Sequence, residues 1–321
     1  MKKKYTILVV SYSQTGQLEE IVGNFLVPFK EYSIDWVKVE PLKAYPFPWN
    51  ASSFFDLMPE CVLEKPTELK PFSIPSISYD LVILGYQPWF LSPSQPATSI
   101  FQNEEFRRCI NGKPVITIVG SRNMWINSQI SIINQIDRCG GILVGNIPLI
   151  DRNSNLISAV TILHWMLNGR KDKLWGVFPK PGVSDKDIQG AVVFGKVVKE
   201  TLEEEKLHEL QDKLLATDQI GITTTIIFIE ERAKKLFSIW AKVITKRGTT
   251  PFKRKVYVKL FEYYLIVALF IVAPIVLSLF FTLFYPFSKK RVKQKREFYL
   301  KGIIKAKDAR RLHYKNREIL T

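Results

Sequence analysis

The feature that most constrains the fold is an apolar run that leads into a polar loop and then a helix. Residues 5–10, YTILVV, are apolar or β-branched without alternation, which predicts a strand buried on both faces, as in a parallel sheet. Residues 11–18 form a hydroxyl- and glycine-bearing loop, and helical spacing begins at Gln17. Free amide groups and the positive end of a helix dipole meet in such a loop. It is therefore predicted to bind an anion, most often a phosphate.

Four more strand patterns follow, separated by helical ones. We expect strands at residues 34–39, 81–85, 114–120 and 141–150, and helices from 17 to near Pro28, at 97–109 and at 126–139. A further helical pattern runs from 185 to about 215, either continuous or broken and restarted near residue 203. Alternation of strands and helices predicts an α/β, flavodoxin-like five-stranded parallel sheet of order 2-1-3-4-5. We assign residues 1–216 to this domain.

Two inserts interrupt the alternation, at residues 41–78 and 151–180. The first is rich in proline and aromatic residues, and so long a loop is uncommon and usually functional. Two interpretations remain open for it: a structural lid packed over a helix, or a substrate-binding segment.

Ligands of such sheets lie beyond the carboxyl ends of the strands. Loops 11–18, 86–96 and 121–125 meet there. The first suits a phosphate, and Gly16 lets the backbone come close to it. The other two carry aromatic faces at Tyr86, Trp89, Phe90 and Trp125, which suit an aromatic ring. No lysine lies in the first loop, which disfavours Walker-type chemistry. Flavin mononucleotide (FMN) contains both a phosphate and an aromatic ring, so it is the expected ligand.

Ser13-Gln-Thr-Gly-Gln17 resembles the phosphate loop of flavodoxins and flavodoxin-like reductases, and departs from it at Leu18, where the family has a hydroxyl. Over nearly its whole length the chain is similar to the flavodoxin-like proteins of dialkylresorcinol biosynthesis, the dialkylresorcinol condensing enzyme DarA family. The stretches that carry this likeness are 45–49 (YPFPW), 54–56 (FFD), 86–89 (YQPW), 120–125 (GSRNMW), 164–166 (HWM), 178–185 (FPKPGVSD) and the late apolar span.

The resemblance implies a step in making a resorcinol ring, but condensation needs a cysteine nucleophile activated by histidine. Three cysteines (61, 109, 139) and three histidines (164, 208, 313) offer no sensible pair along the sequence. We therefore interpret the chain as an FMN-dependent oxidoreductase that aromatises a dialkylated cyclohexanedione-type ring. Two alternatives remain: a flavodoxin-type electron carrier or quinone reductase at the membrane, and a flavin-free scaffold for a partner ketosynthase.

The candidate site residues follow from these loops. Arg122, for the negative end of the ring or a substrate enolate, and Asp151 and His164, as acid–base partners, are the catalytic candidates. The cysteines show no CxxC spacing, so the sequence predicts no metal site. The cofactor-binding candidates are Ser11, Ser13, Gln14, Thr15, Gly16, Gln17, Tyr86, Gln87, Trp89, Arg122, Asn123 and Trp125.

The C-terminal part predicts attachment to a membrane. Residues 265–287 hold no charge and would span about 35 Å as a helix, enough for the core of a bilayer. The net charge of +16 is concentrated in the tail 288–321, with thirteen bases and three acids, which suits anionic lipid rather than nucleic acid. Residues 217–262 would form an amphipathic connector, and 263–287 the hydrophobic segment, either one span or a re-entrant hairpin kinked at Pro274.

These features, with unpaired cysteines typical of a reducing compartment, predict a protein on the cytoplasmic face of the inner membrane. A lipidic small molecule is the expected substrate.

Overall fold

The computed structural model describes residues 4–76 and 78–301. Its core is a five-stranded parallel sheet of order β2-β1-β3-β6-β7. Renumbered by sheet strands alone this is 2-1-3-4-5, the flavodoxin-like order, so the predicted fold class is confirmed. The strands are β1 (Thr6–Ser11), β2 (Ser33–Lys38), β3 (Leu81–Tyr86), β6 (Pro114–Ser121) and β7 (Ile142–Ile150).

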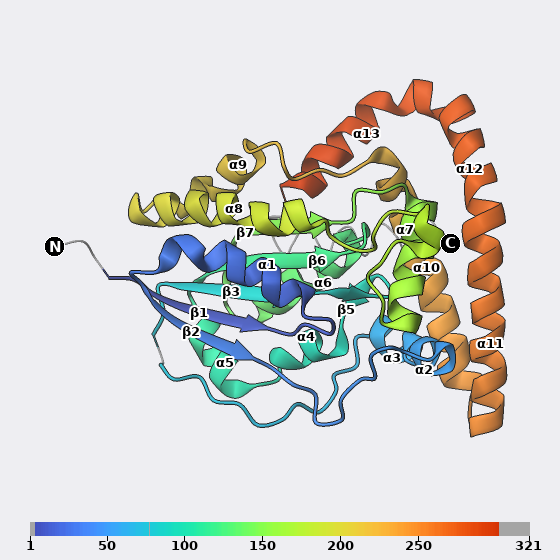
Figure 1. Cartoon of the computed structure of the whole chain (residues 1–321), viewed down its shortest axis with the longest axis horizontal. Helices are drawn as coiled ribbons and strands as arrows, with labels where there is room; N and C mark the ends of the chain where they lie inside the picture. Colours follow the sequence, from blue (N-terminus) through green and yellow to red (C-terminus); the bar gives the residue numbers. More distant parts are fainter. Residues whose placement is uncertain (1–3, 77, 302–321) are drawn as a thin grey trace.

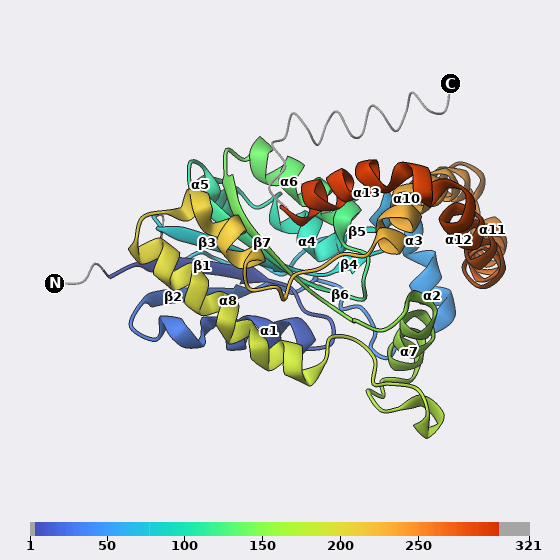
Figure 2. The ribbon, with the colours of Figure 1, turned by 90° about the horizontal axis from the view of Figure 1, so that it is seen from above.

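Helices cover both faces of the sheet, as Figure 2 shows. α1 (Gln17–Leu26) and α8 (Asp185–Glu203) pack on one face, where Ile7 and Val9 of β1 point. α4 (Gln95–Ile100), α5 (Glu104–Ile110) and α6 (Ile126–Arg138) pack on the other, against Leu8 and Val10. Because each face of β1 packs into a separate hydrophobic cluster, every central position of the strand is apolar.

The structure defines helix boundaries that the sequence left open or placed differently. The helix expected at 97–109 is two helices, because the Asn103 side chain caps α5 by accepting from the Phe106 amide. The helix from Asp185 ends at Glu203, and α9 (Leu210–Leu215) is separate. α10 (Thr224–Arg247) begins inside the β-branched stretch 221–229, where the Thr223 hydroxyl accepts from the Ile226 amide.

The helices of both inserts lie at the carboxyl edge of the sheet, and the chain after α3 runs back alongside the sheet to β3 (Figure 1). The first contains α2 (Ala51–Asp56) and α3 (Met58–Val62), and the second contains α7 (Asn155–Asn168). The Trp49 amide donates to the Met166 carbonyl (2.8 Å), so the inserts contact each other. A short hairpin, β4 (Pro88–Trp89) and β5 (Ser92–Pro93), follows β3 at the same edge.

The chain then forms one long helical run, Pro251–Leu300. It consists of α11 (Pro251–Val267), a π-helical segment (Ala268–Val272), α12 (Ala273–Leu279), a second π-helical segment (Phe280–Phe284) and α13 (Tyr285–Leu300). This run is long and apolar enough to cross a membrane, and its most apolar window is 0% buried. Length and composition alone are weak evidence for a membrane anchor. Residues 302–321 of the predicted basic tail lie outside the described residues.

Candidate functional site

The loop between β1 and α1 presents unpaired donors. Within the described chain, the amide groups of residues 13–18 donate to no acceptor, and the Ser13 hydroxyl is buried without a hydrogen-bond partner. Gly16 has a φ of 81°, and a side chain added there would meet no atom within 4 Å. Open space in front of free amides at a helix N-terminus suits a phosphate.

Other predicted residues of this loop hold it in place. The Ser11 hydroxyl accepts from Trp36 Nε1 (2.9 Å). The side-chain amide of Gln17 accepts from the backbone N–H of Val183 (3.1 Å) and donates to its carbonyl (3.2 Å). Gln14 Nε2 donates to the Pro46 carbonyl (3.2 Å) and its Oε1 accepts from Tyr12. Thr15 is half-buried beside them.

An aromatic wall stands beside the loop. The Trp89 ring makes edge contacts with Tyr12 (5.9 Å between centroids), Tyr45 (5.0 Å) and Trp49 (6.0 Å). Tyr45 and Trp49 come from the first insert, so this insert forms part of the wall. Phe90 turns instead towards Phe54 (4.7 Å).

Tyr86 does not present its ring at this edge. β3 runs one residue further than predicted, so Tyr86 is the last strand residue and its side chain enters the core, fully buried. Its hydroxyl donates there to Gln129 Oε1 (2.7 Å). Trp125 is also buried, 1% exposed, at the start of α6.

Four buried polar atoms at the ends of β1, β3 and β6 lack a partner in the described structure. An unsatisfied buried polar group costs about 1–3 kcal/mol, so such groups normally meet a ligand or water. Together with the open space at Gly16, these four atoms provide the kinds of donor and acceptor that a phosphate and a polar-edged ring would require. They are Ser13 Oγ, Gln87 Nε2, Asn123 Oδ1 and Trp125 Nε1.

Arg122 and Asp151 lie together. The Asp151 amide donates to the Arg122 carbonyl (2.7 Å), and Arg122 Nη1 donates to the Asn155 carbonyl (3.0 Å). Burial lowers the pKa of Arg122 to about 10, against the opposing effect of Asp151. Asp151 is 1% exposed, and its two oxygens accept from Asn153 and Ser158. Arg122 therefore keeps its charge at neutral pH, while Asp151 pins the loop.

His164 lies on α7, and within the described structure no contact joins it to Arg122 or Asp151. Its Nε2 is 2.8 Å from Asp172 Oδ1, and Nδ1 is 3.2 Å from the Asn168 amide. The hydrogen bond with His164 lowers the pKa of Asp172. This pair belongs to the second insert.

The three thiols are free. Burial raises the pKa of Cys61, Cys109 and Cys139, so each favours the protonated form rather than the nucleophilic thiolate. No thiol contacts an imidazole in the part of the chain described.

Sequence reasoning missed Glu230 and Lys234 of α10. Glu230 is fully buried, its Oε1 accepts from the Asn127 amide (2.8 Å), and burial raises its pKa to about 7. Lys234 donates to the Ser92 hydroxyl (2.7 Å), and burial lowers its pKa. Glu230 follows Ile227 by three residues and Lys234 precedes Phe237 by three, so both lie along the apolar stripe of α10. An acid and a base at core positions were the available signal.

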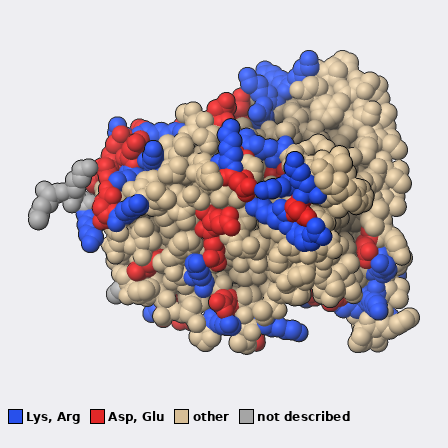
Figure 3. Space-filling model, in the orientation of Figure 1, with Lys and Arg blue, Asp and Glu red and all other residues tan. Residues whose placement is uncertain are grey.

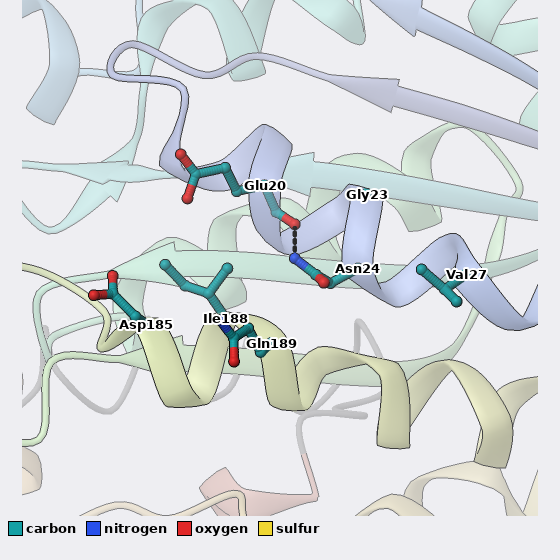
Figure 4. Close-up of a pocket in the computed structure, with 7 residues that line it drawn as sticks. All are labelled: Glu20, Gly23, Asn24, Val27, Asp185, Ile188 and Gln189. Carbon is teal, nitrogen blue, oxygen red and sulfur yellow. Dashed lines mark hydrogen bonds between the residues drawn. The ribbon is translucent and has the colours of Figure 1, made fainter.

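A hollow of about 570 Å³ lies between α1 and α8 (Figure 4), and its lining does not include the candidate site residues. The figure shows Glu20 and Asp185 at its rim and no basic side chain among the residues drawn. It therefore offers nothing that attracts an anion.

No protein-family model matches the sequence, and no curated protein matches it. Solved structures resemble it distantly. A flavoprotein in complex with FMN from Lactobacillus acidophilus is 15% identical, with a TM-score of 0.37, over 45% of this chain and 93% of its own. A flavodoxin from the domain Archaea is 13% identical (TM-score 0.34; 62% and 99%), and a flavone reductase 10% (0.31; 63% and 64%). At these values the likeness concerns the arrangement of the backbone alone.

Proposed function

We propose that this chain is a membrane-attached, FMN-dependent oxidoreductase. The single observation that carries the proposal is the set of unpartnered donors in the phosphate loop, namely the amides of residues 13–18 and Ser13 Oγ, in front of the open space at Gly16. A phosphate would satisfy these donors, and the helix dipole of α1 would favour its charge.

The ring of the cofactor would lie against Trp89 and near Gln87 and Asn123, where Gln87 Nε2 could donate to its polar edge and Asn123 Oδ1 could accept from it. Bound FMN would supply hydride acceptance from a substrate. The role left to the chain is orientation and charge: Arg122 stabilises negative charge on the ring or on a substrate enolate, and Trp89 excludes water from one face.

For the substrate we propose a dialkylated cyclohexanedione-type ring, oxidised to a resorcinol. The support is the sequence resemblance to dialkylresorcinol proteins, together with the position of the aromatic wall. Phe54 and Phe90 join the wall to Phe237 and Phe261, next to the apolar helix (6.5 and 5.3 Å). A lipophilic ring arriving from a membrane would meet this side of the molecule first.

Cofactor binding is tested with purified protein and a matched pair of glycine variants. The wild-type protein should show flavin absorption and release FMN on heating. Gly16→Ala should weaken FMN binding at least tenfold, because the methyl group enters the phosphate cradle. Gly112→Ala is the control: Gly112 also has a positive φ (70°) and open space around it, so the backbone strain is matched. Colourless protein that binds no added FMN would support the scaffold alternative instead.

Enzyme and carrier are then separated by substrate. Flavin-loaded protein incubated with a dialkylated cyclohexanedione should reduce its flavin and yield the resorcinol. Flavin that is reduced only by a partner reductase or a quinol, with no resorcinol formed, would indicate an electron carrier or quinone reductase.

A further inference from the structure

The helical run 251–300, called the arch below, begins firmly attached to the α/β domain. The Arg254 guanidinium donates to Asp56 Oδ1 (2.6 Å) and Glu60 Oε2 (2.8 Å), which belong to α2 and α3. These bonds raise the pKa of Arg254. About two helical turns later, Phe261 is fully buried against Phe55 and α10.

The end of the arch returns to the same domain. Tyr299 is 4% exposed and its hydroxyl donates to Glu231 Oε1 of α10 (2.8 Å), as does Lys295 Nζ (2.8 Å). Gln211 Nε2 of α9 donates to the Leu300 carbonyl (3.0 Å). Both ends of the apolar segment are therefore fixed to one body.

The middle of the arch also stays beside the domain. The Phe280 ring lies 4.1 Å from that of Phe228, and the Arg232 guanidinium covers the Phe228 ring at 3.4 Å. A straight helix of this length would measure about 75 Å. Figures 1 and 2 show instead that α11 and α12 follow one side and α13 turns back across the domain. The second π-helical segment and Pro286 lie where this bend occurs.

The outer face of the arch is apolar and uncovered. Ile271, Ile275, Leu279 and Phe287 are 56%, 56%, 52% and 92% exposed. Soluble monomers rarely expose so large a continuous apolar patch. Basic side chains border it on both sides: six of residues 246–259 and six of residues 289–296 are Lys or Arg. Figure 3 shows the basic groups of α13 at one end of this largely uncharged side.

We propose that the arch is a monotopic attachment: its apolar outer face enters one leaflet of an anionic phospholipid bilayer and does not cross it. A crossing helix would carry one basic flank about 30 Å through the hydrocarbon core. That would break either the Arg254 contacts or those of Tyr299 and Lys295. With both flanks on the domain side, the ten flanking bases other than Arg254 and Lys295 lie on the side of one leaflet with anionic headgroups, in agreement with the positive-inside tendency.

This inference shares only membrane attachment with the proposed function, so it is tested without reference to flavin. In the full chain, Cys139→Ser removes the one native thiol that is not buried. Single reporters are then added at exposed positions: Lys43→Cys on the domain, Lys253→Cys before the apolar segment and Lys293→Cys after it. Each variant is expressed in a bacterial host and treated with a membrane-impermeant maleimide, in spheroplasts and in inverted inner-membrane vesicles.

All three reporters should react in inverted vesicles and none in spheroplasts. Reaction of the Lys293→Cys thiol from the side opposite to Lys43→Cys would establish a single crossing and overturn the proposal. Protein found only in the soluble fraction would overturn it as well. The flavin spectrum of the same preparations reports the proposed function independently of either result.

Discussion

Two helices of this protein begin directly after strands of the sheet, and their N-termini are treated in opposite ways. The amides ahead of α1 have no acceptor in the described structure, whereas the Asn127 amide at the start of α6 donates to the buried carboxylate of Glu230, supplied by α10. In the described structure, the N-terminal amides of α1 thus have no acceptor, whereas an N-terminal amide of α6 is paired with a carboxyl group of the protein itself. The N-terminus of α1 is thus the one of these two that leaves room for the proposed phosphate, while α10 supports the loop after β6.

Removing the buried carboxyl group of Glu230 should have the largest effect. Glu230→Ala should lower the free energy of unfolding by about 3–5 kcal/mol, because it strips the acceptor from α6 and leaves Lys234 with less compensation. Lys242→Ala, at an exposed position of the same helix, should change it by less than about 0.5 kcal/mol. Denaturant unfolding measures both. Equal, small effects would show that the cap does not brace the loop.

The same carboxylate should make stability depend on pH. Burial raises the pKa of Glu230 from 4.5 to about 7, so the folded state prefers the protonated form. This contribution is complete below pH 4.5 and is lost as pH rises through 7, about 3 kcal/mol in all. The wild-type protein should therefore lose stability relative to Glu230→Gln between pH 4.5 and 7. Parallel stability curves for the two proteins would contradict the assignment.

The substitution with the smallest expected effect lies in the loop before α1, and it should change ligand binding without changing stability. Ser13→Ala removes a hydroxyl without a partner, so the free energy of unfolding without ligand should change by no more than about 0.5 kcal/mol. Affinity for FMN should fall about threefold to tenfold, as expected for one lost hydrogen bond. Titration of apoprotein followed by flavin fluorescence measures this. A loss of stability with unchanged affinity would place the hydroxyl in the packing rather than in the phosphate site.

The sheet was predictable because its signals are local. Apolar runs such as 81–85 identify buried strands by themselves, and Ser13 and Gly16 identify the loop that follows β1. The direction of a side chain at the end of a strand cannot be predicted from nearby residues alone. Because β3 extends one residue further than predicted, the Tyr86 side chain points into the core. The wall around Trp89 and the Glu230 cap join residues far apart in sequence, so their partners could not be found from spacing. Whether the candidate residues bind FMN stays a prediction.

The contact between α1 and α8 has one further consequence. A Cβ on Gly195 of α8 would lie 2.0 Å from the Phe25 carbonyl of α1, so backbone meets backbone there, and Gln17 fixes the other end of α1 to Val183. The helix that follows the phosphate loop is thus fixed at both of its ends, which also holds the loop in place. A ligand that enters it has little chain entropy to remove, which leaves more of its contact energy for affinity.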